Sequence, residues 1–426
     1  MKSRIAIVDG VRTPFVKAFT AFNNLSSKEL GRIAFSEVIQ RTEINPNLID
    51  EVIVGSVATT SDSANIGRVI SLLAGVPQSK RAMTVSRNCA SGIEAVTSAY
   101  EKIVVGADEV VLAGGAESMS SVPFTYTKKA QETFMALGKA TPLQRMAALW
   151  KIKGELVKPN IGLQEALTDP VCGLNMGQTA EVLAKEFSIS RRDQDEFSLA
   201  SHMKAAASKA KLAEEIVPVE VGPDYKTTVD FDNGVREKQS MEDLSKLKPY
   251  FERGTGTVTA GNSSQITDGA AAVLIMPEEK AKALGYKPLG YIRSYSYEGL
   301  DPRRIGLGPA FAIPSALKKA GLTLKDIQLF EINEAFAAQV IGCERALASD
   351  AFCKKELGLA GACGTIRREI LNVNGGGIAL GHPVGVTGTR LILTLLKELA
   401  RRGQNLGVAS LCIGGGQGAA IVLERE

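Results

Sequence analysis

Apolar residues fall into two patterns along this chain: short continuous runs and longer stretches with helical spacing. Continuous runs of about four to eight apolar residues predict buried strands, whereas apolar residues recurring about every three to four positions predict amphipathic helices. The two kinds of element alternate, which predicts an α/β fold built in layers. The expected strands are Ile5–Val8, Val52–Val57, Met83–Ser86, Glu109–Ala113, Leu289–Ser296, Ile327–Ile332, Ile370–Val373, Gly407–Cys412 and Ala419–Leu423. The expected helices are Ser27–Arg41, Ala64–Ala74, Gly92–Val105, Pro309–Ala320 and Gly388–Leu399.

The order of elements recurs at the two ends of the chain, which indicates two related halves. In the first half, an apolar strand meets Cys89, a helix follows, and the next strand ends in glycines. In the second half, an apolar strand meets the loop Gly375–His382, a helix follows, and the next strand ends at Cys412 and glycines. Cys89 and His382 therefore occupy similar strand-to-helix junctions. If the halves pack about a pseudo-two-fold axis, both loops face one cavity.

The alternation stops in the middle of the chain. Residues 121–249 are rich in Lys, Gln, Met and Ala and are expected to form helices and loops. This predicts a first half made of residues 1–120 plus 250–280, an inserted loop domain at 121–249, and a second half at 281–426.

One helix of the insertion is expected to begin at Thr141-Pro142-Leu143-Gln144. Thr suits the N-cap, Pro the first helical position, and Gln can close a capping box. Basic residues surround the apolar face of this helix. Two interpretations stay open: the face docks on the body of the protein, or it faces the substrate or a membrane surface. The face consists of Leu143, Met146, Ala147 and Trp150.

Composition excludes several classes of function. The 426 residues are 45% hydrophobic and 23% charged, as in a globular protein, and the net charge of +4 predicts no nucleic-acid partner. The six cysteines are scattered without zinc-ligand spacing, which predicts reduced thiols in an intracellular compartment and no metal site. An expected strand follows the first residues, and no apolar run approaches the roughly 20 residues of a membrane-spanning helix. We therefore expect neither a secretory leader nor a transmembrane segment.

Cys89 and His382 are the first candidates for chemistry. Cys89 stands where a helix is expected to begin, and both the backbone N–H groups and the helix dipole there favour a thiolate. The alternative is a buried structural cysteine. His382 lies between a glycine-rich loop and Pro383, a setting that favours a base at a turn over a ring that fills the core. His202, the other histidine, lies in a charged, alanine-rich stretch and is expected on a solvated helix face.

Two further positions stand at the ends of expected strands. Cys412 is followed by Gly414 and two more glycines, whose backbone N–H groups can converge on a negative oxygen. The glycines lack the order of a nucleotide-binding loop. Asn333 follows the strand Ile327–Ile332, and its amide either faces a site and holds a water molecule or caps a helix.

Taken together, these segments resemble the thiolase family over nearly the whole chain. The resemblance implies the thiolase fold, with two pseudo-repeated halves layered α-β-α-β-α and a largely helical inserted domain. It also implies an acyltransferase that cleaves 3-ketoacyl-CoA with CoA. The matching motifs are Asn88–Gly92, Gly114–Ser120, Met176–Glu181, Gly256–Ser264, Asn333–Phe336, Gly381–Pro383 and Cys412–Gly414.

The resemblance also implies a role for each site residue. Cys89 would be acylated, His382 would take its proton and help bind the thioester oxygen, and Cys412 would move the proton at the acetyl α-carbon. Asn333 would hold a water molecule in a first oxyanion hole. The N–H groups of Cys89 and Gly414 would form a second one. At the periphery, Ser264 would touch the pantetheine arm of CoA and Met176 would line the acyl pocket.

The same resemblance implies that CoA is a substrate and that no metal or redox cofactor is needed. It implies a homodimer or homotetramer in the cytoplasm of a bacterium, or in the mitochondrial matrix for a processed eukaryotic chain. The stretch 149–153 is similar to the β subunits of fatty-acid oxidation complexes, which implies medium or long acyl chains and a hydratase/dehydrogenase partner chain. Those relatives often carry His where Asn333 stands.

Three other functions stay open. A biosynthetic acetyl-CoA acetyltransferase that makes acetoacetyl-CoA would share these residues. A decarboxylating ketosynthase usually needs a second catalytic histidine, and the context of His202 disfavours one. A non-catalytic scaffold that binds acyl-CoA would retain its role without Cys89.

Overall fold

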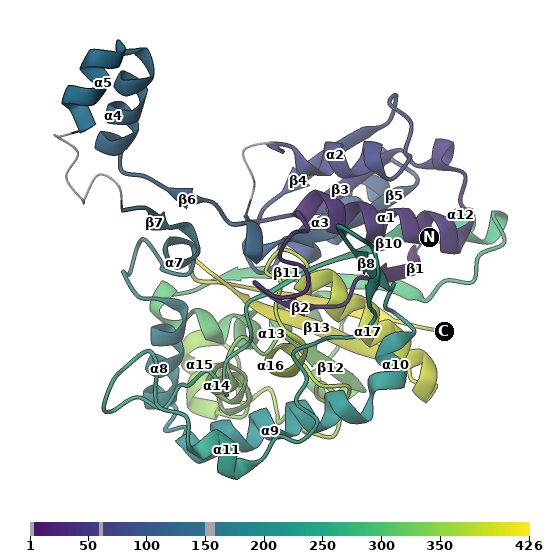
Figure 1. The fold of residues 1–426 in the computed structure, drawn as a ribbon. Helices are drawn as coiled ribbons and strands as arrows, with labels where there is room; N and C mark the ends of the chain where they lie inside the picture. The colour runs from purple at the N-terminus through teal and green to yellow at the C-terminus, as the bar shows by residue number, and fades with distance from the viewer. Residues whose placement is uncertain (1–3, 59–62, 150–157) are drawn as a thin grey trace.

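A computed structural model describes residues 4–58, 63–149 and 158–426. Its largest feature is a mixed ten-stranded sheet covered by helices (Figure 1). Nine strands follow the order β12-β13-β14-β11-β1-β10-β5-β3-β4, and β2 pairs with β10. These strands are β1 (Ile5–Arg12), β2 (Val16–Lys17), β3 (Glu51–Gly55), β4 (Arg81–Val85), β5 (Val111–Glu117), β10 (Thr267–Pro277), β11 (Gly290–Gly299), β12 (Leu329–Ile332), β13 (Leu406–Ile413) and β14 (Gln417–Glu424).

The two halves of the sheet repeat one arrangement, as the sequence predicts. In the first half, β10 lies antiparallel to β1 and β5, and β3 lies parallel to β5 and β4. In the second half, β14 lies antiparallel to β11 and β13, and β12 lies parallel to β13. The first strands of the halves, β1 and β11, pair antiparallel and join the two parts into one sheet.

Three apolar clusters make the fold a stack of five layers. The first packs α1 (Ser27–Thr42) and α2 (Ile66–Leu73) on the outer face of the first half. The second packs α13 (Gly308–Ala320) and α14 (Ala337–Leu347) on the outer face of the second half. The third holds α3 (Ser91–Val104) and α17 (Thr387–Arg402) against strands of both halves. The layered α-β-α-β-α prediction is confirmed. Shorter helices are α12 (Glu278–Ala283), α15 (Asp350–Leu357) and α16 (Gly377–Leu380).

The predicted strand at Ile370–Val373 is wrong. Only Leu371 pairs there, through a single parallel bridge to Phe330 of β12, in the place that β4 takes beside β3. Asn372 has a positive φ of 45°, which turns the chain away from an extended path. The Asn372 side chain takes the place of the next backbone hydrogen bonds between the two segments. Its Oδ1 accepts the Ile332 N–H at 2.8 Å, and its Nδ2 donates to the Ile332 carbonyl at 2.9 Å.

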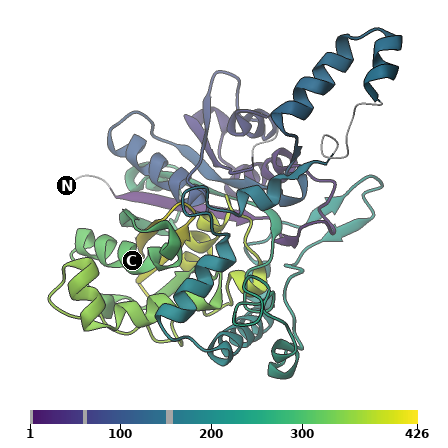
Figure 2. The same ribbon diagram turned by 90° about the vertical axis from the view of Figure 1, so that its left-hand side faces the viewer.

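The first part of the insertion stands away from the body as a helical hairpin (Figures 1 and 2). A two-residue ribbon of β6 (Phe124–Thr125) and β7 (Asn160–Ile161) leads to α4 (Lys128–Lys139) and α5 (Pro142–Leu149). The predicted capping box is present, since the Thr141 N–H donates to Gln144 and the Gln144 N–H donates to Thr141.

The apolar face of α5 does not dock on the body where its side chains are described. Leu143 is 76% exposed and Met146 is 62% exposed, so the docking interpretation is wrong for both. The predicted member Trp150 lies outside the described residues, and so does the stretch 150–157 that precedes β7.

The rest of the insertion packs on the second half. Helix α8 (Met176–Glu186) contacts α14, and α9 (Arg191–Ala207) contacts α14 and α16. His202 on α9 is only 2% exposed and accepts the Arg236 N–H at Nδ1, so its predicted solvated position is wrong. The charged residues of α9 misled the prediction, because His202 shares a buried face with small residues. The other elements are α7 (Gly162–Ala166), α10 (Lys209–Ala213), α11 (Met241–Ser245), β8 (Val219–Val221) and β9 (Thr227–Val229).

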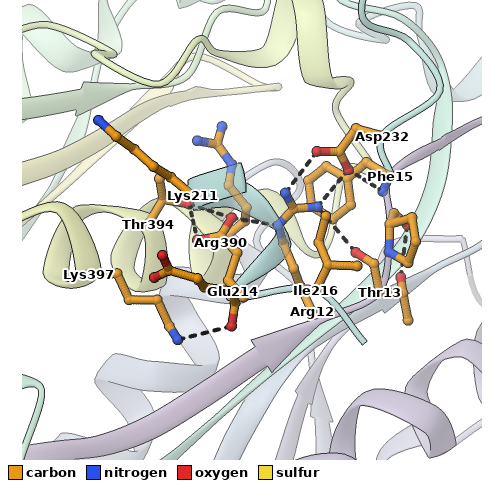
Figure 3. A network of polar contacts seen from close by, with 12 residues as sticks. Arg12, Thr13, Phe15, Lys211, Glu214, Ile216, Asp232, Arg390, Thr394 and Lys397 are labelled. Carbon is orange, nitrogen blue, oxygen red and sulfur yellow. Dashed lines mark hydrogen bonds and ion pairs between the residues drawn. The ribbon is translucent and has the colours of Figure 1, made fainter. Parts of the chain in front are cut away.

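A buried ion cluster fixes the insertion to both halves (Figure 3). Arg12, the last residue of β1, donates to both carboxylate oxygens of Asp232 at 2.6 and 2.8 Å. It also donates to Glu215 at 2.7 Å, and Thr394 of α17 donates to the same carboxylate. Because these charges are fully removed from water, their mutual hydrogen bonds must offset a large desolvation cost.

Candidate active site

Cys89 lies in the short turn between β4 and α3. Asn88 before it has a positive φ of 45°, and Ala90 after it is the residue that caps α3. The Ser91 hydroxyl accepts the Arg87 N–H at 2.9 Å and donates to the Asn88 carbonyl at 2.7 Å, which holds the turn. The cysteine is half-buried, so part of the residue stays exposed at the start of the helix.

Backbone N–H groups face the Cys89 sulfur. Burial raises the pKa of the Cys89 thiol, whereas the N–H groups of Gly414 and of Cys89 itself lower it. The carboxylate of Glu117 also raises this pKa. The two N–H groups come from different halves, and they are the pair predicted for the second oxyanion hole. Donors converging on one point are suited to stabilise a negative oxygen that forms beside the sulfur.

Cys412 lies beside Cys89. It is buried near the end of β13, and its pKa is raised well above the usual value by burial and then by the neighbouring Cys89 thiol. The Asn88 amide donates to the Gly414 carbonyl at 2.8 Å and ties the two cysteine-bearing segments together. The thiol is therefore protonated at neutral pH, ready to give a proton to a strong base such as a carbanion.

His382 is buried in the loop between α16 and α17. Its Nδ1 lies 2.6 Å from the Thr387 hydroxyl, which donates its single proton to the Pro383 carbonyl at 3.0 Å. With the hydroxyl proton on the Pro383 carbonyl, Nδ1 donates to the hydroxyl, and in this tautomer the lone pair is on Nε2. Burial, followed by the charge of Arg390, lowers the pKa of His382 to about 4. The ring is neutral at pH 7 and can accept a proton at Nε2.

Asn333 offers a buried amide with open hydrogen-bonding capacity. Its Nδ2 and Oδ1 have no hydrogen-bond partner among the described residues, although the side chain is fully buried. A buried polar group left unpaired costs about 1–3 kcal/mol, which favours a site for a bound polar group. The helix-cap alternative is wrong, because Phe336 occupies the N-cap position of α14. A Cβ on Gly377 would lie 2.8 Å from Oδ1, so the amide also borders α16.

Ser264 and Met176 lie on two segments that border this site. The Ser264 N–H donates to the Ala335 carbonyl at 2.9 Å, and Gln265 beside it accepts the His382 N–H at 3.3 Å. Met176 is half-buried at the first position of α8. The turn before it contacts the glycines after Cys412, since the Gly415 N–H helps to lower the pKa of Asp169.

Two side chains at the site are not predicted from the sequence. Thr387 orients His382 from five residues downstream, and Glu117 contacts the loop after His382. Glu117 lies inside the motif Gly114–Ser120. The motif identifies the segment but does not single out Glu117 as a site residue. Thr387 has no sequence signal beyond its closeness to His382.

Neither a metal centre nor a membrane span is found in the part of the chain that the structure describes. No group of three or more His, Cys, Asp or Glu side chains there could hold a metal ion. No helix among those residues is long and apolar enough to cross a bilayer.

Comparison with known proteins gives one consistent family. The family models for the thiolase N-terminal and C-terminal domains match residues 5–279 and 286–425. The 3-ketoacyl-CoA thiolase of Shewanella halifaxensis (strain HAW-EB4) is 42% identical over 426 residues, covering 99% of this chain and 97% of the relative.

Two solved structures have the same fold. Human mitochondrial 3-ketoacyl-CoA thiolase in complex with CoA matches with a TM-score of 0.86 at 35% identity, over 100% of this chain and 98% of that one. The Bacillus anthracis acetyl-CoA acetyltransferase matches with a TM-score of 0.85 at 38% identity, over 99% and 98%. With both halves matched by family models and the sheet repeated in each, this chain belongs to the thiolase family.

Proposed function

We propose that this protein is a 3-ketoacyl-CoA thiolase, an acyltransferase of fatty-acid β-oxidation that cleaves 3-ketoacyl-CoA with CoA. The observation that carries the proposal is the pair of thiols Cys89 and Cys412 beside the Gly414 N–H group. Two thiols of different accessibility next to backbone donors suit a reaction that needs both a nucleophile and an acid.

The first half-reaction transfers the acyl group to Cys89. His382 takes the thiol proton at Nε2, and the thiolate attacks the 3-keto carbon, whose oxygen is held by the N–H groups of Cys89 and Gly414. The bond between the α and β carbons then breaks and leaves an acetyl-CoA enolate, which Cys412 protonates at carbon. A water molecule held by Asn333, together with His382, stabilises the enolate oxygen. One such donor contributes about 3 kcal/mol to the transition state.

The second half-reaction releases the shortened chain. The thiol of CoA loses its proton to the Cys412 thiolate, attacks the acyl-Cys89 thioester, and expels Cys89 as a thiolate that recovers the proton held by His382. All charges and protons return to their starting positions, so no resident cofactor takes part. The order of events predicts ping-pong kinetics. Ser264 contacts the pantetheine arm and Met176 lines the acyl pocket.

Mass spectrometry of the protein mixed with a 3-ketoacyl-CoA tests this proposal. The expected result is one acyl adduct, located on Cys89 and absent from the Cys89→Ala variant. A protein that binds acyl-CoA but forms no adduct would instead support the non-catalytic scaffold.

The biosynthetic direction is the second candidate, favoured by the likeness to the Bacillus anthracis acetyl-CoA acetyltransferase. The discriminating measurement is the cleavage rate of 3-ketoacyl-CoA over a range of chain lengths. The oxidative role predicts faster cleavage of medium or long chains than of acetoacetyl-CoA. A preference for acetoacetyl-CoA, or comparable rates for short and long chains, would favour the synthase.

The hairpin of α4 and α5 is proposed to touch a membrane surface or a hydratase/dehydrogenase partner chain. Apolar and basic side chains are exposed together on it, including Phe134, Met135, Leu143 and Arg145. Such a surface suits the interface of an anionic bilayer. Sedimentation with anionic liposomes, compared between the protein and Leu143→Glu, tests the membrane contact, and co-purification tests the partner.

We also propose a homodimer or homotetramer, because β4 ends the sheet with partly exposed residues and an open edge that another chain can cover. The proposal includes a first half at 1–120 plus 250–280, a loop domain at 121–249 and a second half at 281–426. It also includes a location in the bacterial cytoplasm, or in the mitochondrial matrix for a processed eukaryotic chain. Light scattering after size exclusion measures the assembly.

A further inference from the structure

Glu117 is a fully buried carboxylate with a set of backbone partners that the proposed reaction does not use. It is the last residue of β5, and its side chain is 0% exposed. Its oxygens accept the N–H groups of Val57 at 3.0 Å, Ala58 at 3.0 Å and Gly385 at 2.9 Å. The Ser56 hydroxyl adds a fourth hydrogen bond at 3.4 Å.

These partners come from both halves of the protein. The segment 56–58 follows β3 in the first half, whereas Gly385 lies three residues after His382 in the second. Glu117 is also close enough to Cys89 for its charge to raise the pKa of that thiol. One carboxylate therefore reaches the loop of the base and the surroundings of the nucleophile.

The packing around Gly385 leaves the loop little freedom. A Cβ on Gly385 would lie 2.8 Å from a Glu117 oxygen and 3.0 Å from the Ser56 Cα. On its other side, a Cβ on Gly115 would lie 2.2 Å from the Gly385 carbonyl, and one on Gly92 would lie 3.1 Å from it. The loop is thus enclosed between the end of β5 and the first turn of α3, the helix that follows Cys89.

We infer that Glu117 is a positioning residue, which holds the His382 loop in register with Cys89 by accepting the Gly385 N–H. The inference rests on the proposed roles of Cys89 and His382. An ionised carboxylate suits this task because it only accepts hydrogen bonds, and four donors converge on it. Burial raises the pKa of Glu117 above its usual value, and the hydrogen bonds from the three N–H groups offset this only in part.

The variant Glu117→Gln tests the inference. The glutamine has the same shape, but its NH2 group would face at least one of the backbone N–H groups and push it away. Since a displacement of about 1 Å can cost about 100-fold in rate, we expect acylation of Cys89 by 3-ketoacyl-CoA to slow about 100-fold. Alkylation of Cys89 by iodoacetamide does not need a substrate carbonyl held in register. It should not slow, because loss of the Glu117 charge removes one influence that raises the pKa of the thiol.

Asp50→Asn is the matched control. Asp50 accepts the N–H groups of Glu109 and Val110 at 2.8 and 3.0 Å, which makes the same kind of contact at the opposite end of β5. We expect this variant to acylate at the wild-type rate. If both variants slowed acylation equally, loss of sheet stability and not of positioning would be the cause.

The results separate this inference from the proposed function. Failure of the wild-type protein to form the Cys89 adduct would reject the proposed function, whereas normal acylation in Glu117→Gln would reject only the role of Glu117. If Glu117→Gln does not fold, Gly385→Ala displaces the same loop by crowding Glu117 and Ser56, and it should slow acylation while leaving alkylation unchanged. Normal acylation there, or failure of both variants to fold, would overturn the inference.

Discussion

The two strand-to-helix junctions of the repeat differ more in burial than in topology. Asn88 and Asn372 both have a φ of 45°, and each follows a chain segment that pairs parallel with its neighbour. In the first junction a full strand, β4, leads directly into half-buried Cys89. In the second, one bridge at Leu371 replaces the strand, and α16 separates it from His382, which is only 8% exposed.

Under the proposed roles of Cys89 as nucleophile and His382 as base, one backbone arrangement would serve two chemical tasks. A nucleophile must meet a large substrate, and the short junction leaves it at an accessible helix start. A neutral base must keep a low pKa, and the long junction folds it into the interior, where burial disfavours the charged ring. Topology is repeated between the halves, and the length of the connection sets how deeply Cys89 and His382 are buried.

Removal of the buried base should have the largest effect. We expect His382→Ala to slow acylation of Cys89 at pH 7 by about 10³-fold, within the range that general bases contribute. Stopped-flow acylation measures this change. The matched control is His202→Gln, which removes a histidine of similar burial and should leave the rate nearly unchanged. An equal loss of acylation rate in both variants would mean that removal of any buried histidine ring slows the reaction, whatever its position.

Substitution of Asn333 tests whether the second half also supplies an amide that holds a water molecule at the oxyanion. Asn333→Ala should lower kcat by about 10²–10³-fold, because the amide would no longer hold the water molecule that faces the developing oxyanion. Asn333→Asp should be slower still, since a carboxylate there would repel the negative oxygen. Steady-state kinetics of both variants decide the point, and an aspartate variant faster than the alanine variant would contradict it.

Replacement of Cys412 should slow the proton transfers and spare the attack of Cys89 on the substrate. We expect Cys412→Ser to form acyl-Cys89 at a near-normal rate but to exchange the acetyl α-proton about 10²-fold more slowly, because a hydroxyl is a weaker acid than a thiol. Deuterium incorporation into acetyl-CoA, followed by NMR, measures the exchange. Cys363→Ser, a cysteine on a different segment, should exchange normally.

The smallest expected effect concerns stability and pH. Burial, then the charge of Arg236, lowers the pKa of His202 to about 4, below the value near 6.5 of an unfolded chain. Between these two pH values the unfolded state therefore binds more protons than the folded state. The contribution of neutral His202 to the free energy of unfolding is complete above about pH 6.5 and is lost as the pH falls towards about 4. From pH 7 to pH 5 the wild type should lose about 2 kcal/mol more than His202→Gln. Urea unfolding at both pH values measures the difference, and parallel losses would contradict it.

Local patterns predict most of the layered fold, because apolar runs and helical spacing depend on near neighbours. The prediction of a strand at Ile370–Val373 is wrong for a local reason. The chain turns at Asn372, and the apolar residues around it give no sign of that turn. The motifs name Cys89, His382 and Cys412 as candidates, and the structure places the first and the last of these side by side. The contact of Glu117 with Gly385 is beyond such patterns, because it joins residues 268 positions apart. The burial of His202 is missed because the charged residues of α9 hide the buried face that His202 shares with small residues.

The narrow ribbon at the base of the helical hairpin makes that arm a separable unit. Only the pairs Phe124 with Ile161 and Thr125 with Asn160 form its two strands, while the site is assembled from loops of the two main halves. Natural selection can therefore lengthen, recharge or delete the arm without rebuilding the catalytic body. The membrane or partner contacts of such an enzyme can therefore change during evolution while its active site stays the same.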